Sequence, residues 1–235
     1  MATKNNKENL LEIKKGNTGY GLLIESDGYM SLSDPSNKVL KESFDPDNWH
    51  VPYPFIVNAV FQKADTKNAN GRIYPRSILE REIENYQTRI RERRALGECN
   101  HPDSSTIDLG RISHNIIELH WEGKTVVGKL ELNLTQGFIK QGICSSLGDT
   151  VANLLLNGYK IGVSSRAIGS VEQKMGVLMV GDDLELLAWD IVADPSTPGS
   201  WIGHDLEELA PYVESKDSKK ANLNEKISKL ENILL

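Results

Sequence analysis

The spacing of apolar residues predicts a strand and then a long helix in the first half of the chain. Phe55-Ile56-Val57 and Ala59-Val60-Phe61 form a β-branched and aromatic run of strand length, which ends in the polar loop 65–71. After Pro75, apolar residues recur at helical steps of three and four until Gly97. These residues are Ile78, Leu79, Ile83, Tyr86 and Ile90. The outer face of this helix mixes Arg and Glu, which is typical of a solvated surface without a function of its own.

The second half of the chain alternates strands with one helix. Two strand-like segments, 112–121 and 125–134, flank Glu122-Gly123-Lys124, and this pattern predicts a hairpin. Hydroxyl residues before 146–157 and a glycine after it predict a capped helix. Further strands are predicted at 160–165, 177–180 and 184–193.

The two ends of the chain carry weaker patterns. Residues 1–48 mix charges with turn residues and hold only short apolar patches, so we interpret them as a loosely structured N-terminal lead-in. Residues 49–215 then form one folded domain, since domains usually have about 100–200 residues. Residues 216–235 hold too few apolar residues to fold alone, and we expect this tail to dock or fray.

Composition limits the class of protein. The 235 residues are 39% hydrophobic and 26% charged, which is typical of a globular chain. A net charge of -6 leaves no basic excess for nucleic acid or an anionic bilayer. Residues 1–9 are polar and no apolar stretch approaches the roughly 18 residues of a membrane span, so we expect a soluble, unsecreted protein. Cys99 and Cys144 stand alone, which favours a reducing compartment and leaves no ligand set for structural zinc.

Three segments hold residues that could carry chemistry. His101 lies in a short loop after the helix and is followed by a proline; most loop histidines have no catalytic role. Segment 160–166 is a strand with two adjacent hydroxyls, Ser164 and Ser165, whose simpler interpretation is a strand with polar residues near its end. Asp190 lies in a strand whose odd and even positions are both apolar, so that both faces should be buried. An unpaired carboxylate in such a strand costs several kcal/mol. It needs a donor, either an imidazole or backbone amides.

Together these residues could form a nucleophile, a base and an orienting acid. A histidine within hydrogen-bond reach removes the proton of a serine hydroxyl, and an acid on the other ring nitrogen fixes the tautomer. The order along the chain would be His101, Ser164 and Asp190. Spacing alone does not bring them together.

Four blocks of sequence, in one order, resemble a known family. The blocks are Asn70-Gly71-Arg72-Ile73-Tyr74-Pro75, Gly97-Glu98-x-Asn100-His101-Pro102, Gly162-Val163-Ser164-Ser165-Arg166 and Asp190-x-Val192-x-x-Pro195-Ser196-x-Pro198. Across residues 55–201 the chain resembles the prohead maturation proteases of tailed phages, which are distant relatives of the herpesvirus assemblin proteases. Several blocks together are far more specific than any one of them.

The resemblance implies an α+β fold, with a compact, mainly antiparallel β-barrel flanked by helices. It implies a serine endopeptidase inside the immature capsid, in the host bacterial cytoplasm, which cleaves scaffold and capsid proteins. His101 matches the base of the family and Ser164 its nucleophile, while Asp190 lies where phage members carry an acid. The sequence departs from the family pattern at Cys99, where an apolar residue is expected, and at Ala167, where many members have glycine.

Two neighbours of Ser164 have open roles. Backbone N–H groups of Ser165 and Arg166 are the nearest candidates for an oxyanion hole. The side chain of Arg166 could hold a water or form a structural ion pair, and we favour the ion pair. Ser165 is the rival nucleophile, because a shift of one residue along a strand exchanges the two faces.

Other functions stay open at this point. A metal site could use His101, His114 and His120 with Asp103 or Asp108, but His114 and His120 are six residues apart on a predicted strand and so about 20 Å apart. A non-enzymatic capsid scaffold or assembly protein would also fit an acidic chain with a helical tail. His204 or Asp194 could replace Asp190 as the third group.

The protease hypothesis requires no cofactor and no metal. Its expected partners are capsid and scaffold proteins as substrates, without nucleic acid or membrane, and a homo-oligomer is compatible with it. The resemblance also implies cleavage after Glu in Leu/Ile-x-Glu segments and self-processing. Such segments end at Glu225 and Glu12, where little apolar area holds the chain down, so we expect self-cleavage there.

Overall fold

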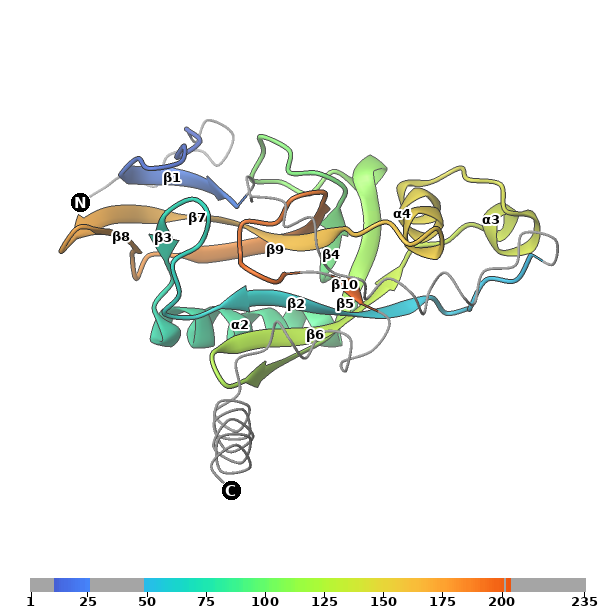
Figure 1. Cartoon of the computed structure of the whole chain (residues 1–235), viewed down its shortest axis with the longest axis horizontal. Coiled ribbons are helices and arrows are strands. Elements are labelled where there is room, and N and C mark those ends of the chain that lie inside the picture. The colour runs from blue at the N-terminus through green and yellow to red at the C-terminus, as the bar shows by residue number, and fades with distance from the viewer. Residues whose placement is uncertain (1–10, 26–48, 201, 204–235) are drawn as a thin grey trace, which may run out of the picture.

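Two five-stranded sheets face each other across a shared core (Figure 1). The computed structural model describes residues 11–25, 49–200 and 202–203. The strands are β1 (Gly19–Ile24), β2 (Ile56–Lys63), β3 (Arg72–Ile73), β4 (Leu96–Glu98), β5 (Ile112–Glu122), β6 (Thr125–Leu132), β7 (Gly162–Lys174), β8 (Val177–Val180), β9 (Glu185–Val192) and β10 (Ile202–Gly203). The helices are α2 (Arg76–Arg91), α3 (Gln136–Gln141) and α4 (Leu147–Leu156), with a short 3-10 turn at Leu109–Arg111.

Strand β7 organises the first sheet. It pairs antiparallel with β1 on one edge and with β8 and β9 on the other, and β3 joins β8 in parallel. The second sheet has the order β10-β2-β6-β5-β4. The predicted α+β class is therefore confirmed, but the described strands form two sheets, so the predicted barrel is not confirmed. None of the described helices is long and apolar enough to cross a membrane.

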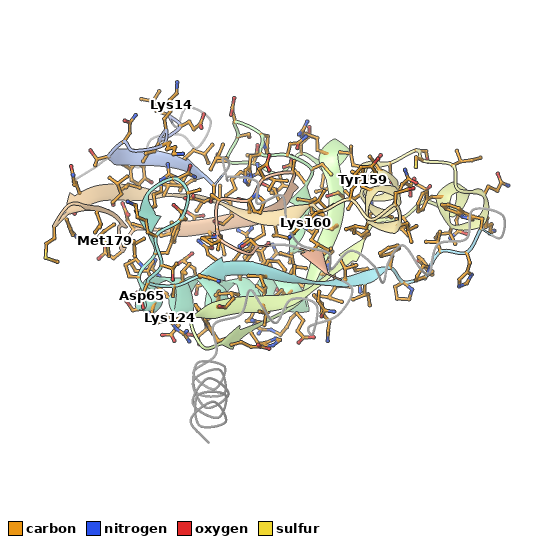
Figure 2. The ribbon with its side chains drawn as sticks, viewed as in Figure 1. Lys14, Asp65, Lys124, Tyr159, Lys160 and Met179 are labelled. Carbon is orange, nitrogen blue, oxygen red and sulfur yellow. The ribbon has the colours of Figure 1, made fainter. Side chains whose placement is uncertain are left out.

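The core lies between the two sheets, where Trp189 of β9 is fully buried. Its ring meets Phe61 of β2 and Tyr86 of α2 edge to face, with centroids 5.4 and 5.0 Å apart. Such pairs contribute about 0.5–1.5 kcal/mol beyond the area they bury. Figure 2 shows side chains filling the space between the layers. This packing fixes β9, and with it the position of Asp190.

The local predictions with strong patterns are confirmed. Strands β5 and β6 form the expected hairpin, with Gly123 at a positive φ of 57° in its turn. Helix α4 begins after Ser146, whose hydroxyl accepts the N–H of Asp149, while the Asp149 carboxylate accepts the N–H of Ser146. This reciprocal cap is worth about 1 kcal/mol and fixes where the helix begins.

The N-terminal lead-in differs from the prediction. Residues 19–24 are not loosely structured, because they form β1, and Leu22 and Leu23 are buried against β7. Figure 1 shows β1 lying along β7. The local pattern is too short to reveal this strand, since its partner lies more than a hundred residues later in the chain. The C-terminal tail, 216–235, lies outside the described residues.

Candidate active site

His101 lies in a loop that starts where β4 leaves its sheet. Gly97 has no room for a side chain, because an added Cβ would lie 2.3 Å from the ring of His114 and from the carbonyl of Trp189. Asn100 adopts a left-handed φ of 58°, which Asn tolerates better than most residues, and its N–H donates to the carbonyl of Ile191 at 2.9 Å. The Gly-Glu-x-Asn-His block thus aims His101 at strand β9.

Asp190 is fully buried and accepts donors of both predicted kinds. Its Oδ2 lies 2.7 Å from Nδ1 of His101, and its Oδ1 accepts the backbone N–H of Glu98 at 3.1 Å. A carboxylate can only accept, so Nδ1 of His101 carries the proton in this pair. That tautomer leaves Nε2 of His101 with a free lone pair.

Arg166 forms the structural ion pairs that we favoured for its side chain. It is fully buried between two carboxylates, with Nε 2.9 Å from Asp190 and Nη2 2.9 Å from Glu98. Nη1 donates to the carbonyl of Ser104 at 2.9 Å, in the loop that follows His101. The guanidinium therefore joins the acid to the loop that holds the histidine.

The carboxylate of Glu98 is the second negative charge of this cluster. Glu98 lies within a sequence motif, but the sequence analysis gave it no role of its own. Its carboxylate pairs with Arg166 and with Arg111, whose Nε lies 3.2 Å away, and accepts the N–H of Asp108 at 3.1 Å. Two carboxylates thus meet two guanidiniums, so the buried charges are compensated. The sequence does hold one indication of this role, since Glu98 is a charged residue within the same conspicuous motif as His101.

Ser164 lies directly opposite Asp190 in the antiparallel pair of β7 and β9. Directly opposed residues share a face of the sheet, so the side chain of Ser164 lies on the same face as Asp190 and Arg166. Its hydroxyl, however, donates to the backbone carbonyl of Glu25. In the described part of the chain, Nε2 of His101 is buried and has no hydrogen-bond partner.

Ser165 lies on the opposite face of β7. It pairs with Trp189, whose ring is in the core, and only 3% of its surface is exposed. Arg166, the second oxyanion candidate, pairs with Ile24 of β1 and Ala188 of β9. A different backbone group reaches the carbonyl beside Ser164: the N–H of Ser196 donates to Glu25 O at 3.4 Å.

The other candidate groups lie elsewhere. His114 is fully buried, with its ring nitrogens near Ser113 Oγ and the Trp189 carbonyl, and burial lowers its pKa to about 4. His120 pairs with Glu118 at the surface. Within the residues that the structure describes, no three His, Cys, Asp or Glu side chains form a group that could hold a metal ion. Asp194 follows the end of β9, and His204 lies outside the described residues.

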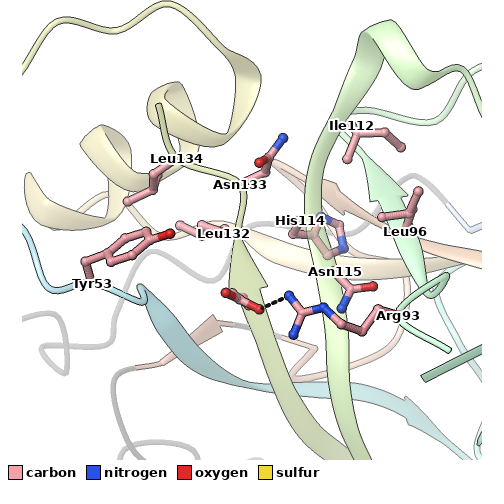
Figure 3. Close-up of a pocket in the computed structure, with 10 residues that line it drawn as sticks. Tyr53, Arg93, Leu96, Ile112, His114, Asn115, Leu132, Asn133 and Leu134 are labelled. Carbon is pink, nitrogen blue, oxygen red and sulfur yellow. Dashed lines mark hydrogen bonds and ion pairs between the residues drawn. The ribbon is translucent and has the colours of Figure 1, made fainter. Parts of the chain in front are cut away.

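A cavity of about 310 Å³ lies apart from these residues (Figure 3). It lies beside Tyr53, at the start of β4 and β5 and the end of β6, and the Arg93–Glu131 ion pair crosses its wall. His114 is a lining residue shared with the core, while His101, Ser164 and Asp190 are not in its wall. The candidate chemistry is therefore not in this cavity.

Comparisons with known proteins agree on one family. The family model described as prohead core protein serine protease matches residues 23–209. The prohead core protein protease of Enterobacteria phage T4 is 29% identical over 164 residues, which cover 68% of this chain and 74% of that protein. A solved structure of the bacteriophage T4 capsid assembly protease superposes with a TM-score of 0.53 at 27% identity, over 58% of this chain and 80% of that one. The match of the family model to most of the sequence shows that this chain belongs to the prohead core protein serine protease family.

Proposed function

We propose that this chain is a serine endopeptidase that cleaves scaffold and capsid proteins inside the immature capsid. One observation carries the proposal. The imidazole of His101 is held at Nδ1 by a buried carboxylate 2.7 Å away, and its Nε2 is left without a partner on the face of the sheet that carries Ser164. A serine, a histidine and an acid arranged in this order form the catalytic machinery of many hydrolases.

In this mechanism Ser164 is the nucleophile. When its hydroxyl leaves the carbonyl of Glu25 and turns to Nε2 of His101, the imidazole takes the proton while Oγ attacks the substrate carbonyl carbon. The resulting imidazolium lies against Asp190, which stabilises its charge, and it returns the proton to the leaving amine. Water then hydrolyses the acyl-enzyme by the same proton transfers in reverse order.

Arg166 and Glu98 act as positioning residues. Arg166 holds both oxygens of Asp190 and the loop after His101, and Glu98 fixes Arg166 from the other side. The side chains of Arg166, Glu98 and Asp190 are fully buried, whereas that of Arg111 is 41% exposed. Precise support of this kind keeps the acid and the base in a productive geometry.

We also retain the assemblin-like barrel as a proposal. The edges of the two sheets meet at two places, where the N–H of Asn100 donates to Ile191 O and the N–H of Val163 donates to Ser200 O, each at 2.9 Å. These bonds support a closed arrangement that passes from β9 to β4 and from β10 to β7.

The second candidate, a non-enzymatic scaffold or assembly protein, is less well supported. A structural protein gains nothing from an imidazole whose second nitrogen is buried without a partner, since such a group costs about 1–3 kcal/mol.

The deciding experiment incubates purified wild-type protein and Ser164→Ala with the capsid and scaffold proteins of the same virus, followed by intact mass. Cleavage by the wild type alone is the expected result. Equal cleavage by both, or by neither while both are folded, would contradict the proposal.

A further inference from the structure

The carboxylate of Glu25 lies in a fully buried pocket made of hydrogen-bond donors. It receives donors from two amides, one guanidinium and two hydroxyls. These are Asn68 Nδ2 at 2.6 Å, Asn70 Nδ2 at 2.7 Å, Arg72 Nη1 at 2.8 Å, Ser196 Oγ at 2.9 Å and Tyr74 Oη. Four of the five come from the Asn-Gly-Arg-Ile-Tyr and Pro-Ser blocks, and Asn68 lies two residues before the first of them. The catalytic proposal gives none of the five a role. The pocket is therefore built around a carboxylate.

The charge of Glu25 is matched by that of Arg72, and both side chains are 1% exposed. Burial is the largest single influence on the pKa of Arg72 and lowers it, but the charges of Glu25 and Tyr74 and the hydrogen bonds to both together outweigh burial, so that pKa is raised. Burial and then the same charge raise the pKa of Tyr74 well above its usual value, so its hydroxyl keeps its proton and donates. A neutral amide in place of the carboxylate would leave Arg72 buried without its counter-charge.

The backbone of Glu25 lies beside Ser164, the proposed nucleophile. Strand β1 pairs antiparallel with β7, and the N–H of Glu25 continues this pairing by donating to Ser165 O at 3.3 Å. Its carbonyl oxygen accepts the hydroxyl of Ser164 and the N–H of Ser196. An extended segment bound by main-chain pairing, with one side chain in a pocket, is a common way to bind peptides.

We propose, on the basis of the proposed function, that β1 is an internal substrate and that Glu25 precedes the bond to be cut. The pocket of Asn68, Asn70, Arg72, Tyr74 and Ser196 is then the specificity site for an acidic side chain. The N–H of Ser196 is placed to donate to the oxyanion. Because Glu25 is fully buried and Ser164 only 2% exposed, the chain fills its own cleft before it reaches any other substrate.

The reaction balances with groups already named. Ser164 Oγ bonds to the carbonyl carbon of Glu25 as His101 Nε2 takes the hydroxyl proton. The carbon–nitrogen bond to residue 26 breaks and His101 gives that proton to the new amine. Water hydrolyses the ester, so the products are a carboxylate at Glu25, an amine at Ser26 and a free Ser164 hydroxyl.

The test uses the full chain as wild type, Ser164→Ala, Glu25→Gln and the matched control Glu12→Gln, which changes an exposed Glu of the same segment. Intact mass and N-terminal sequencing of aged samples should find a chain that begins at Ser26 in the wild type and in Glu12→Gln. Ser164→Ala should lack it, and Glu25→Gln should form it at least about 100-fold more slowly, because a site built for one polar group strongly rejects its analogue.

A second measurement does not depend on how Glu25→Gln folds. Wild-type protein is given a synthetic peptide with the sequence of residues 19–30, or the same peptide with Gln at position 25. Cleavage after Glu, with the Gln peptide at least about 100-fold slower, supports the pocket, whereas equal rates would overturn it. Cleavage of capsid proteins by a wild type that stays intact after Glu25 would refute the internal substrate alone. Absence of any cleavage and of serine labelling by a fluorophosphonate would refute the protease proposal as well.

Discussion

Ser164 and Asp190 face each other across neighbouring antiparallel strands, and this register distinguishes the two adjacent serines. Side chains alternate along a strand, so Ser165 lies on the face that carries Trp189. The loop with His101 approaches only the first face, because its imidazole binds Asp190.

The first prediction concerns these two serines. Ser164→Ala should lower the rate of peptide cleavage by at least about 10⁴-fold, because it removes the proposed nucleophile, and should leave thermal unfolding nearly unchanged. Ser165→Ala, the matched control on the opposite face, should keep activity within about tenfold. Fluorophosphonate labelling of both variants checks the assignment. Labelling that persists in Ser164→Ala and disappears in Ser165→Ala would reverse it.

Much of the fold can be predicted because it depends on local pattern. The hairpin of β5 and β6 and the cap of α4 each depend on residues that are close in sequence. Strand β1 does not, because the three apolar residues at 22–24 are interpretable only beside residues 166–168. A short apolar patch in a charged segment has no partner until the chain folds.

The candidate site, like the fold, can be predicted from the sequence only in part. The need of Asp190 for a donor follows from the apolar strand around it, and the structure supplies His101 and the N–H of Glu98. The role of Arg72 does not follow from its own neighbourhood, because the carboxylate that it binds is 47 residues earlier in the chain. Leu23-Ile24-Glu25 also fits the Leu/Ile-x-Glu pattern, but the charged and turn residues around it give no local sign that it lies in a strand.

Asp190→Asn should reduce cleavage by about 10⁴-fold and still leave more activity than Ser164→Ala. The amide can hold His101 only with the proton on the wrong nitrogen, so the base is lost while binding and the oxyanion donors remain. Single-turnover rates on one peptide provide the comparison, with Asp182→Asn, an exposed carboxylate in the turn before β9, as the control. Wild-type rates in Asp190→Asn would move the third role to another group.

Arg166→Gln should lower the free energy of unfolding by about 3–5 kcal/mol, because it removes the guanidinium beside the buried carboxylate of Asp190 and leaves Glu98 with only the partly exposed Arg111. Arg93→Gln is a matched control, since this arginine pairs with Glu131 while its side chain is 73% exposed. Removing that exposed pair should cost less than about 1 kcal/mol. Urea unfolding at neutral pH measures both, and similar losses in the two variants would show that Arg166 is not an essential buried link.

His114 should make the fold sensitive to mild acid. Burial lowers its pKa to about 4 in the folded chain, from the usual 6.5 of a solvated imidazole. The unfolded chain therefore binds a proton as the pH falls below 6.5, while the folded chain does not until about pH 4. Stability from this group is fully present above pH 6.5 and is lost between the two values, and the difference amounts to about 3 kcal/mol.

This loss of stability with falling pH can be tested by replacing the imidazole with an amide that cannot be protonated in this range. In His114→Gln the amide can still donate to the carbonyl of Trp189, so we expect the variant to fold. Because the amide does not fill the space of the ring, the variant should be less stable than wild type at pH 7. It should nevertheless lose less stability between pH 7 and pH 4.5, because it has no imidazole to protonate. His120→Gln makes the same replacement at a side chain that is 41% exposed. Urea midpoints at several pH values give the slopes. If wild type and His114→Gln lose stability in parallel, the acid sensitivity of the fold comes from its carboxylates and not from this buried histidine.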